Sequence, residues 1–116
     1  MGNPIVHWEL MVSDPEKAKA FYSAIFDWEF DGTDFPGYWL IKTGSDPGGG
    51  LMAKPEMAPT SALNTYFGVA DVDATVTKAV AAGATLLVPK TEIPGMGYWA
   101  MIADPDGIPV GLFQGQ

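Results

Sequence analysis

The single histidine of the chain lies two positions before a glutamate, a spacing that could support acid–base chemistry. His7, Glu9 and Met11 belong to the apolar segment 5–12, which has the composition of a strand. Because side chains alternate between the two faces of a strand, these three are predicted to share one face. An imidazole beside a carboxylate can bind a ligand or transfer a proton near neutral pH. In the alternative interpretation, His7 pairs with Asn64 or Glu9 and only fixes the strand pairing.

Glu9 is the one carboxylate that we expect on this face, because Asp14, Asp71 and Asp73 belong to helix starts. Two roles are open for it. As a catalytic base or a metal ligand, Glu9 would act together with His7. As the partner of a lysine at the rim of the sheet, it would be structural. The candidate lysines are Lys42 and Lys54.

The composition excludes several kinds of site. The chain has 116 residues, 14 acidic and 6 basic side chains, and a formal net charge of −8. All the basic residues except the single histidine are lysines, and there is no cysteine. Disulfides, thiol nucleophiles and thiolate zinc sites are therefore excluded, as is a bidentate arginine clamp for phosphate or carboxylate. Without a basic cluster, nucleic-acid binding is not expected.

The length and hydropathy predict one soluble domain. With 47% hydrophobic residues, a chain of this size can bury a core without metal or disulfide staples. Charged residues interrupt every apolar run near the N-terminus, so no signal peptide is expected. No run approaches the roughly 18 apolar residues of a membrane span. We expect a cytoplasmic protein that does not bind membranes.

The chain contains an internal repeat. Three short matches occur in the same order in both halves, which predicts two duplicated units that differ by loop insertions. They are Val12-x-Asp14 with Val69-x-Asp71, Gly37-Tyr38-Trp39 with Gly97-Tyr98-Trp99, and Gly50-Leu51-Met52 with Gly111-Leu112-Phe113.

Each half is predicted to run strand, helix and three strands. Asp14 caps the first helix, with Pro15 at its first position, and Asp71 caps the second, which Gly83 ends. The apolar residues at helical spacing in the first helix are Ala18, Phe21, Tyr22, Ile25 and Phe26. The strand-like runs are 5–12, 28–31, 38–43, 50–54, 85–88, 98–103 and 109–114.

The predicted fold class is α+β, with two tandem βαβββ modules. Residues 1–116 form one domain, with a first module at 5–54, a linker at 55–63 and a second module at 64–114. A lone module leaves one sheet face bare, so the two should combine into one curved, mostly antiparallel sheet. That sheet would be a half-barrel cup with the helices outside.

Several short motifs stand out in the opening strand and helix of the first half and along the second half. They are His7-Trp8-Glu9-Leu10-Met11-Val12-Ser13-Asp14, Lys17-Ala18-Lys19-Ala20-Phe21-Tyr22, Asp71-Val72-Asp73-Ala74, Pro94-Gly95-Met96-Gly97-Tyr98 and Asp104-Pro105-Asp106-Gly107. With the element order, they resemble the vicinal oxygen chelate superfamily, which contains glyoxalase I, bleomycin-resistance proteins and extradiol dioxygenases. Gly49-Gly50-Leu51-Met52 and Asn64-Thr65 are similar to a bacterial subgroup described only as related to lactoylglutathione lyase. The resemblance covers nearly the whole chain and is specific for the fold, not for the activity.

The resemblance also implies where a metal would bind. The family's four ligand positions correspond to His7, Gly50, Asn64 and Gly111. Only His7 is a standard ligand, Asn64 offers a weak carbonyl oxygen, and the glycines offer no side chain. Catalytic sites normally have three protein donors. We therefore expect no cofactor and no bound metal, with a divalent metal as the alternative, and the family's carboxylate base is absent from these positions.

The strand period of two predicts a small-molecule cup. A cavity lined by tyrosine, methionine and phenylalanine with a few polar groups suits a small, partly aromatic ligand. In the alternative, these side chains fill the space left by the two glycines. The predicted ligand-binding residues are His7, Met11, Gly50, Met52, Asn64, Tyr66, Gly111 and Phe113.

Other aromatic and loop residues are assigned around the cup. Trp8 and Trp28 are predicted to pack by the first helix, whereas Trp39 and Trp99 could be core or pocket wall. The segment 91–97 could be a mobile lid or an ordered turn.

Three kinds of function follow from these features. The first is an enzyme of lyase, isomerase or oxygenase type acting on a small carbonyl or aromatic metabolite, with His7 and Glu9 as catalytic residues. The alternative is a binding protein that sequesters a ligand or drug without turnover, since an acidic surface attracts cationic drugs. In a third interpretation the cup is filled core and function lies at a dimer interface. A homodimer is expected, with modules that pair within one chain or exchange between two.

Overall fold

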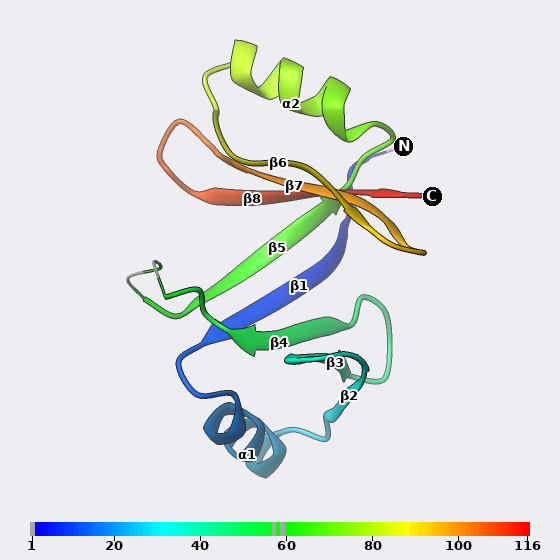
Figure 1. The fold of residues 1–116 in the computed structure, drawn as a ribbon, viewed down its shortest axis with the longest axis vertical. Helices are drawn as coiled ribbons and strands as arrows, with labels where there is room; N and C mark the ends of the chain where they lie inside the picture. Colours follow the sequence, from blue (N-terminus) through cyan, green and yellow to red (C-terminus); the bar gives the residue numbers. More distant parts are fainter. Residues whose placement is uncertain (1, 57, 59) are drawn as a thin grey trace. The chain divides into compact units, whose positions relative to one another are not determined.

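A computed structural model describes residues 2–56, 58 and 60–116. Met57 and Pro59 of the predicted linker lie outside the described residues. The described part contains eight strands and two helices (Figure 1), which confirms the α+β class. In chain order they are β1 Ile5–Val12, α1 Pro15–Ile25, β2 Glu29–Phe35, β3 Tyr38–Lys42, β4 Gly49–Ala53, β5 Ala62–Gly68, α2 Val72–Ala81, β6 Thr85–Ile93, β7 Gly97–Ala103 and β8 Pro109–Gly115.

The strands have the predicted order, but some bounds differ. β1 has the predicted bounds, whereas β2 and β6 extend further along the chain than the runs 28–31 and 85–88. β5 begins at Ala62, inside the predicted linker 55–63. In the described part of the chain, neither helix is long and apolar enough to cross a membrane.

The chain divides into two compact units, which we name by their residues. The 7–64 unit holds α1 and β2 to β4 with most of β1. The 65–116 unit, which also includes residues 2–6, holds α2 and β6 to β8 with most of β5. Within each unit one pair of strands is parallel, β1 with β4 and β5 with β8, and the others are antiparallel.

Helix α1 begins and ends as the sequence predicts. The Asp14 carboxylate accepts hydrogen bonds from the backbone N–H groups of Glu16 (3.1 Å) and Lys17 (3.3 Å), and Pro15 takes the first helical position. These bonds satisfy amides that have no partner inside the helix. The predicted apolar stripe is only partly core, because Phe21, Ile25 and Phe26 are exposed at 58%, 54% and 48%.

Tryptophans cover the helix-facing side of the sheet in the 7–64 unit. The Trp8 ring lies 2.5 Å from where a β-carbon at Gly49 would stand, so this position requires glycine. Trp28 packs against both Trp8 and Tyr22 of α1, each with ring centroids 5.3 Å apart. The predicted place of Trp28 by the first helix is confirmed, and Trp8 packs against Trp28. Leu51 is fully buried on this side.

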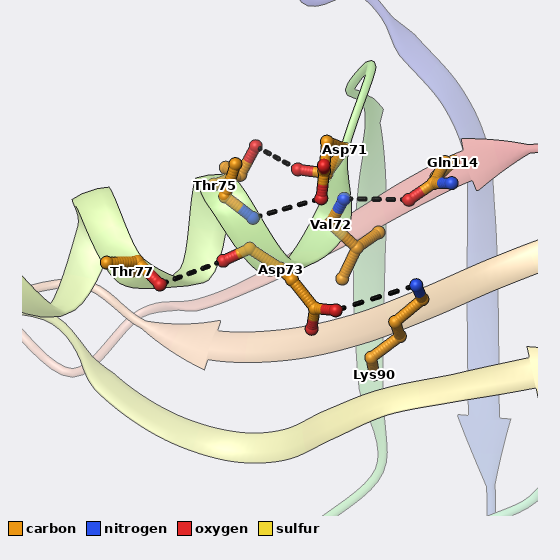
Figure 2. A network of polar contacts seen from close by, with 8 residues as sticks. Asp71, Val72, Asp73, Thr75, Thr77, Lys90 and Gln114 are labelled. Carbon is orange, nitrogen blue, oxygen red and sulfur yellow. Dashed lines mark hydrogen bonds and ion pairs between the residues drawn. The ribbon is translucent and has the colours of Figure 1, made fainter.

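Helix α2 is tied to its sheet by a side chain from β8 (Figure 2). The Val72 N–H donates to the Gln114 side-chain oxygen at 2.8 Å, and Val72 is fully buried. Asp71 caps the helix through the Ala74 N–H at 3.0 Å. Lys90 of β6 pairs with Asp73 in the first turn at 3.5 Å. The positive φ of Gly83, 112°, follows the end of the helix, as predicted.

The Gly-Tyr-Trp repeat is shifted by one residue in the structure. Tyr38 pairs with Met52, and Trp99 pairs with Phe113. Both steps, 38 to 99 and 52 to 113, are 61 residues, whereas the sequence match had aligned Tyr38 with Tyr98 at a step of 60. A shift of one residue moves a side chain to the other face of a strand.

Trp39 and Trp99 are therefore not equivalent. The Lys19 ammonium of α1 lies 4.5 Å from the Trp39 ring centroid, so Trp39 faces the helix. Trp99 instead packs edge-on against Tyr66, with centroids 6.2 Å apart.

The segment 91–97 forms the hairpin between β6 and β7. Thr91 pairs with Trp99 and Ile93 with Gly97, and the Met96 N–H donates to the Ile93 carbonyl at 2.9 Å. Main-chain pairing extends into the turn, which favours the alternative of an ordered turn.

The Gln114 contact generates a first prediction. Gln114→Leu leaves the Val72 N–H at a buried helix start without this acceptor, which costs about 1–2 kcal/mol of unfolding free energy. Urea denaturation measures the loss. Gln116→Leu, at the exposed C-terminal residue, is the matched control and should change little. Equal stability of the two variants would contradict a stabilising role of the Val72–Gln114 hydrogen bond.

Candidate functional site

Three polar side chains form a hydrogen-bonded chain on one face of the 7–64 unit. The Tyr38 hydroxyl donates to the Glu9 carboxylate at 2.7 Å. The same hydroxyl lies 2.8 Å from His7 Nε2. His7 Nε2 and the Glu9 oxygen are 3.9 Å apart. We call this arrangement, His7, Glu9 and Tyr38, the polar triad.

The strand register explains why these residues meet. Glu9 of β1 pairs with Gly50 of β4, which pairs with Leu40 of β3. Tyr38 is two residues before Leu40, so its side chain lies on the same face and reaches diagonally across β4. His7 is likewise two residues before Glu9. The predicted shared face of His7 and Glu9 fits this register.

Gly50 makes the reach of Tyr38 sterically possible. A β-carbon at position 50 would collide with the Tyr38 hydroxyl and ring, and Gly50 is buried. The space of the missing side chain is thus occupied by the end of a tyrosine from the neighbouring strand. Gly50 was predicted to line a cup, and the structure places a polar group of the triad directly over it.

Burial controls the protonation of His7. The side chains of His7 and Glu9 are 30% and 13% exposed. Burial lowers the pKa of His7 below its ordinary value, and the negative charge of Glu9 opposes this in part. The ring is therefore neutral at pH 7. The triad offers one carboxylate, one phenol and one neutral imidazole.

Asn64 and Met11 form a second contact in the 7–64 unit. The Asn64 amide donates to the Met11 sulfur at 3.8 Å, and Asn64 is only 7% exposed. Met11 and Met52 pair across β1 and β4, on the same face as Glu9. The soft thioether groups give this face an apolar part beside the polar triad.

Apart from Asn64, the predicted residues of the second module belong to the 65–116 unit and are closely packed. The Tyr66 ring covers Gly111, and a β-carbon at position 111 would collide with it. Tyr66 is 7% exposed, and Trp99, which packs on it, pairs with Phe113. In this unit the side chains fill the space at the glycine, as the alternative interpretation held.

The two candidate rim lysines have other partners. Lys42 lies 3.7 Å from Asp31 of β2, and the Lys54 ammonium donates to the Ala58 carbonyl at 3.0 Å. Glu9 is held by Tyr38 instead.

Tyr38 is the member of the polar triad that the sequence did not predict. It was noticed only as part of the Gly-Tyr-Trp repeat. The usable signal was Gly50, because a glycine beside a carboxylate on an inner strand leaves a gap that a large side chain can enter from the adjacent strand.

Comparison with known proteins identifies the family of this chain. A profile of the Glyoxalase/Bleomycin resistance protein/Dioxygenase superfamily matches residues 4–112. The chain belongs to this superfamily. Curated relatives from Mycobacterium bovis and Mycobacterium tuberculosis, each named "Putative glyoxylase CFP32", are 34% identical to it over 121 residues. The match covers 97% of this chain and 46% of each relative, so the chain spans about half the length of these relatives.

Solved structures of several activities share the fold. The Mn(II)-bound glyoxalase from Novosphingobium aromaticivorans matches 97% of this chain and 38% of its own, with a TM-score of 0.70 and 23% identity. Methylmalonyl-CoA epimerase from Mycobacterium tuberculosis matches 97% of this chain and 87% of its own, with a TM-score of 0.70 and 18% identity. At these identities the likeness supports the fold alone.

The residues present do not fit the metal that this superfamily implies. Within the described residues, no group of three or more His, Cys, Asp or Glu side chains could hold an ion. Tyrosines cover both glycines that stand at ligand positions, 50 and 111. His7 and Glu9 alone are fewer donors than a catalytic metal needs.

The lowered pKa of His7 predicts a pH-dependent stability. The folded protein resists protonation of His7, whereas the unfolded chain protonates it near pH 6.5. The stability that depends on neutral His7 is therefore complete above about pH 6.5 and declines as the pH falls below it, by at most about 1.4 kcal/mol per pH unit. His7→Asn should abolish this slope. Urea unfolding of both proteins between about pH 5 and 7.5 measures the difference, and identical slopes would contradict it.

The fit of Tyr38 over Gly50 predicts a coupled stability effect. Gly50→Ala should cost about 1–3 kcal/mol, because the methyl group displaces the Tyr38 ring and its hydrogen bonds. In a Tyr38→Ala background the same change should cost much less, which a double-mutant cycle measures. Gly115→Ala is the control, because nothing lies within 4 Å of its added carbon. Equal costs in both backgrounds would count against the fit.

Proposed function

We propose that this protein is an enzyme of isomerase or lyase type that moves a proton next to the carbonyl group of a small metabolite, without a metal. The observation that carries the proposal is the polar triad. A neutral imidazole, partly exposed, is linked through a phenol to a largely buried carboxylate. Such a group can accept a proton and stabilise the resulting positive charge.

The proposed reaction begins with removal of a proton from the carbon next to the carbonyl. The carbon–hydrogen bond breaks, its electron pair stays on the substrate as an enolate, and the proton moves to neutral His7. Glu9 stabilises the imidazolium through Tyr38. Return of the proton to the same carbon inverts or exchanges that centre. For an α-hydroxy-carbonyl compound, the hydroxyl proton moves to the enolate oxygen, and return of the abstracted proton to the former carbonyl carbon completes an isomerisation.

The relatives support a reaction of this kind. The curated relatives have the word glyoxylase in their names, and an epimerase and a glyoxalase share the fold. An epimerase changes the configuration of a carbon atom. Proton transfer at carbon is therefore compatible with this fold, and the polar triad supplies a group for it in this chain.

Proton exchange in heavy water tests the proposal without knowledge of the product. The probes are dihydroxyacetone, the hemithioacetal of methylglyoxal with glutathione, and phenylacetone, and proton NMR follows loss of the signal next to the carbonyl. With a probe that is accepted, His7→Asn and Glu9→Gln should slow exchange by about 10²–10⁴-fold, the usual size of a general acid–base contribution. Glu29→Gln, at an exposed position of β2, is the matched control and should exchange like the unaltered protein.

Two results would overturn the proposal. One is exchange no faster than the spontaneous rate with all three probes. The other is catalysed exchange that His7→Asn leaves unchanged, which would place the base elsewhere.

A second candidate function is a binding protein that sequesters a ligand without turnover. The net charge of −8 and the absence of arginine favour a cationic ligand over an anionic one. In the heavy-water experiment this function gives changed probe line widths or shifts and no exchange. Equilibrium dialysis with a cationic glycopeptide antibiotic then tests binding directly, and loss of binding at raised salt would support an electrostatic contribution.

A further inference from the structure

We infer that Tyr38 is a positioning residue that holds His7 as the Nε2–H tautomer and makes Nδ1 the basic atom. The catalytic meaning of this inference rests on the proposed function. The structural part of the inference is that Nε2, and not Nδ1, of His7 carries the proton. This can be measured whether or not a substrate is known.

The position of the proton follows from the donors and acceptors of the triad. An ionised carboxylate only accepts hydrogen bonds, and a phenol has one hydrogen to donate. The Tyr38 hydrogen is directed to Glu9 at 2.7 Å. The remaining short contact, 2.8 Å from the Tyr38 oxygen to His7 Nε2, is then a hydrogen bond only if Nε2 carries the proton. A neutral imidazole has one N–H, so its lone pair is on Nδ1.

This arrangement resembles the hydrogen bond by which a carboxylate orients a catalytic histidine. There, the carboxylate accepts from one ring nitrogen and so leaves the other as the base. Here a phenol is inserted between the carboxylate and the ring. When Nδ1 takes a proton, both ring nitrogens are donors and the positive charge remains directed, through Tyr38, at Glu9. The 3.9 Å separation of Nε2 and the Glu9 oxygen allows direct attraction as well.

The same arrangement opposes metal coordination through Nε2 of His7. A metal at Nε2 would need that nitrogen without a hydrogen, and Nε2 is engaged with Tyr38. A ligand side chain at position 50 would collide with the Tyr38 hydroxyl. Tyr38 therefore excludes a metal-ligating side chain at position 50, while it orients the ring of His7 as a base.

The 65–116 unit has no equivalent of this arrangement. In its internal register Trp99 corresponds to Tyr38, 61 residues earlier. Tyr66 corresponds to Glu9, 57 residues earlier. Tyr66 is paired with Gly111 and covers it directly. The positioning role is therefore specific to Tyr38, although Tyr98 is its match in the sequence.

Nitrogen-15 NMR of the imidazole tests the inference directly, because the chain has a single histidine and needs no assignment. Near pH 7.5 the unaltered protein should show a protonated Nε2 and an unprotonated Nδ1. Tyr38→Phe keeps the ring but cannot accept the hydrogen bond, so its signals should move toward a mixture of the two tautomers. Tyr98→Phe, whose ring lies by Lys90 on the helix side, is the matched control and should leave the histidine signals unchanged.

A pH titration of the same signals adds a readout that packing alone would not move. Glu9→Gln removes the charge that raises the pKa of His7, so the pKa should fall further in this variant. Tyr38→Phe should also slow catalysed proton exchange by about tenfold or more, since a misdirected lone pair weakens general base catalysis.

The outcomes separate this inference from the proposed function. A protonated Nδ1 in the unaltered protein, or histidine signals that Tyr38→Phe does not move, would overturn the inference even if exchange is catalysed. The expected tautomer with no exchange of any probe would uphold the positioning by Tyr38 and overturn the proposed enzyme.

Discussion

A carboxylate that leaves water must regain its hydrogen bonds from the protein, and this requirement shapes one face of the 7–64 unit. Loss of hydration by an ion costs several kcal/mol unless nearby donors compensate. The Glu9 side chain is 13% exposed, and the Tyr38 hydroxyl binds it at 2.7 Å. That hydroxyl arrives from two strands away and crosses β4 over Gly50. Carboxylate, tyrosine and glycine therefore depend on one another, and His7 is positioned by the group that they form.

The two halves of the chain show how one backbone framework can carry different chemistry. In both, a residue of the opening strand pairs with a glycine 41 or 45 positions later, as Glu9 does with Gly50 and Tyr66 with Gly111. In the first half a tyrosine from the next strand covers the glycine, and in the second the paired residue covers it itself. The first solution leaves a polar group that can exchange protons. The second gives a packed aromatic cluster of Tyr66 and Trp99.

Local features of the fold could be predicted from the sequence, and cross-strand features could not. Asp14, Pro15 and Asp71 act within one helical turn, so their capping roles were predicted correctly. The shared face of His7 and Glu9 follows from the period of a single strand. The contact of Tyr38 with both depends on the register of three strands, which a single sequence does not specify. The Gly-Tyr-Trp match even suggested a register one residue from the true one, which would have put Tyr98 in the place of Trp99.

A histidine at a family ligand position can act as a metal ligand or as a general base, and the two roles exclude each other because they use the same lone pair. A metal needs a bare ring nitrogen together with further donors around it, and the non-coordinating nitrogen is then the one that a neighbouring group orients. A base needs the same orientation, but its lone pair must stay available to the substrate. In this chain the donors that would complete a metal site are replaced by Gly50, Asn64 and Gly111, while the orienting group is present as Tyr38 with Glu9. An orienting contact that is present without the companion donors favours the base.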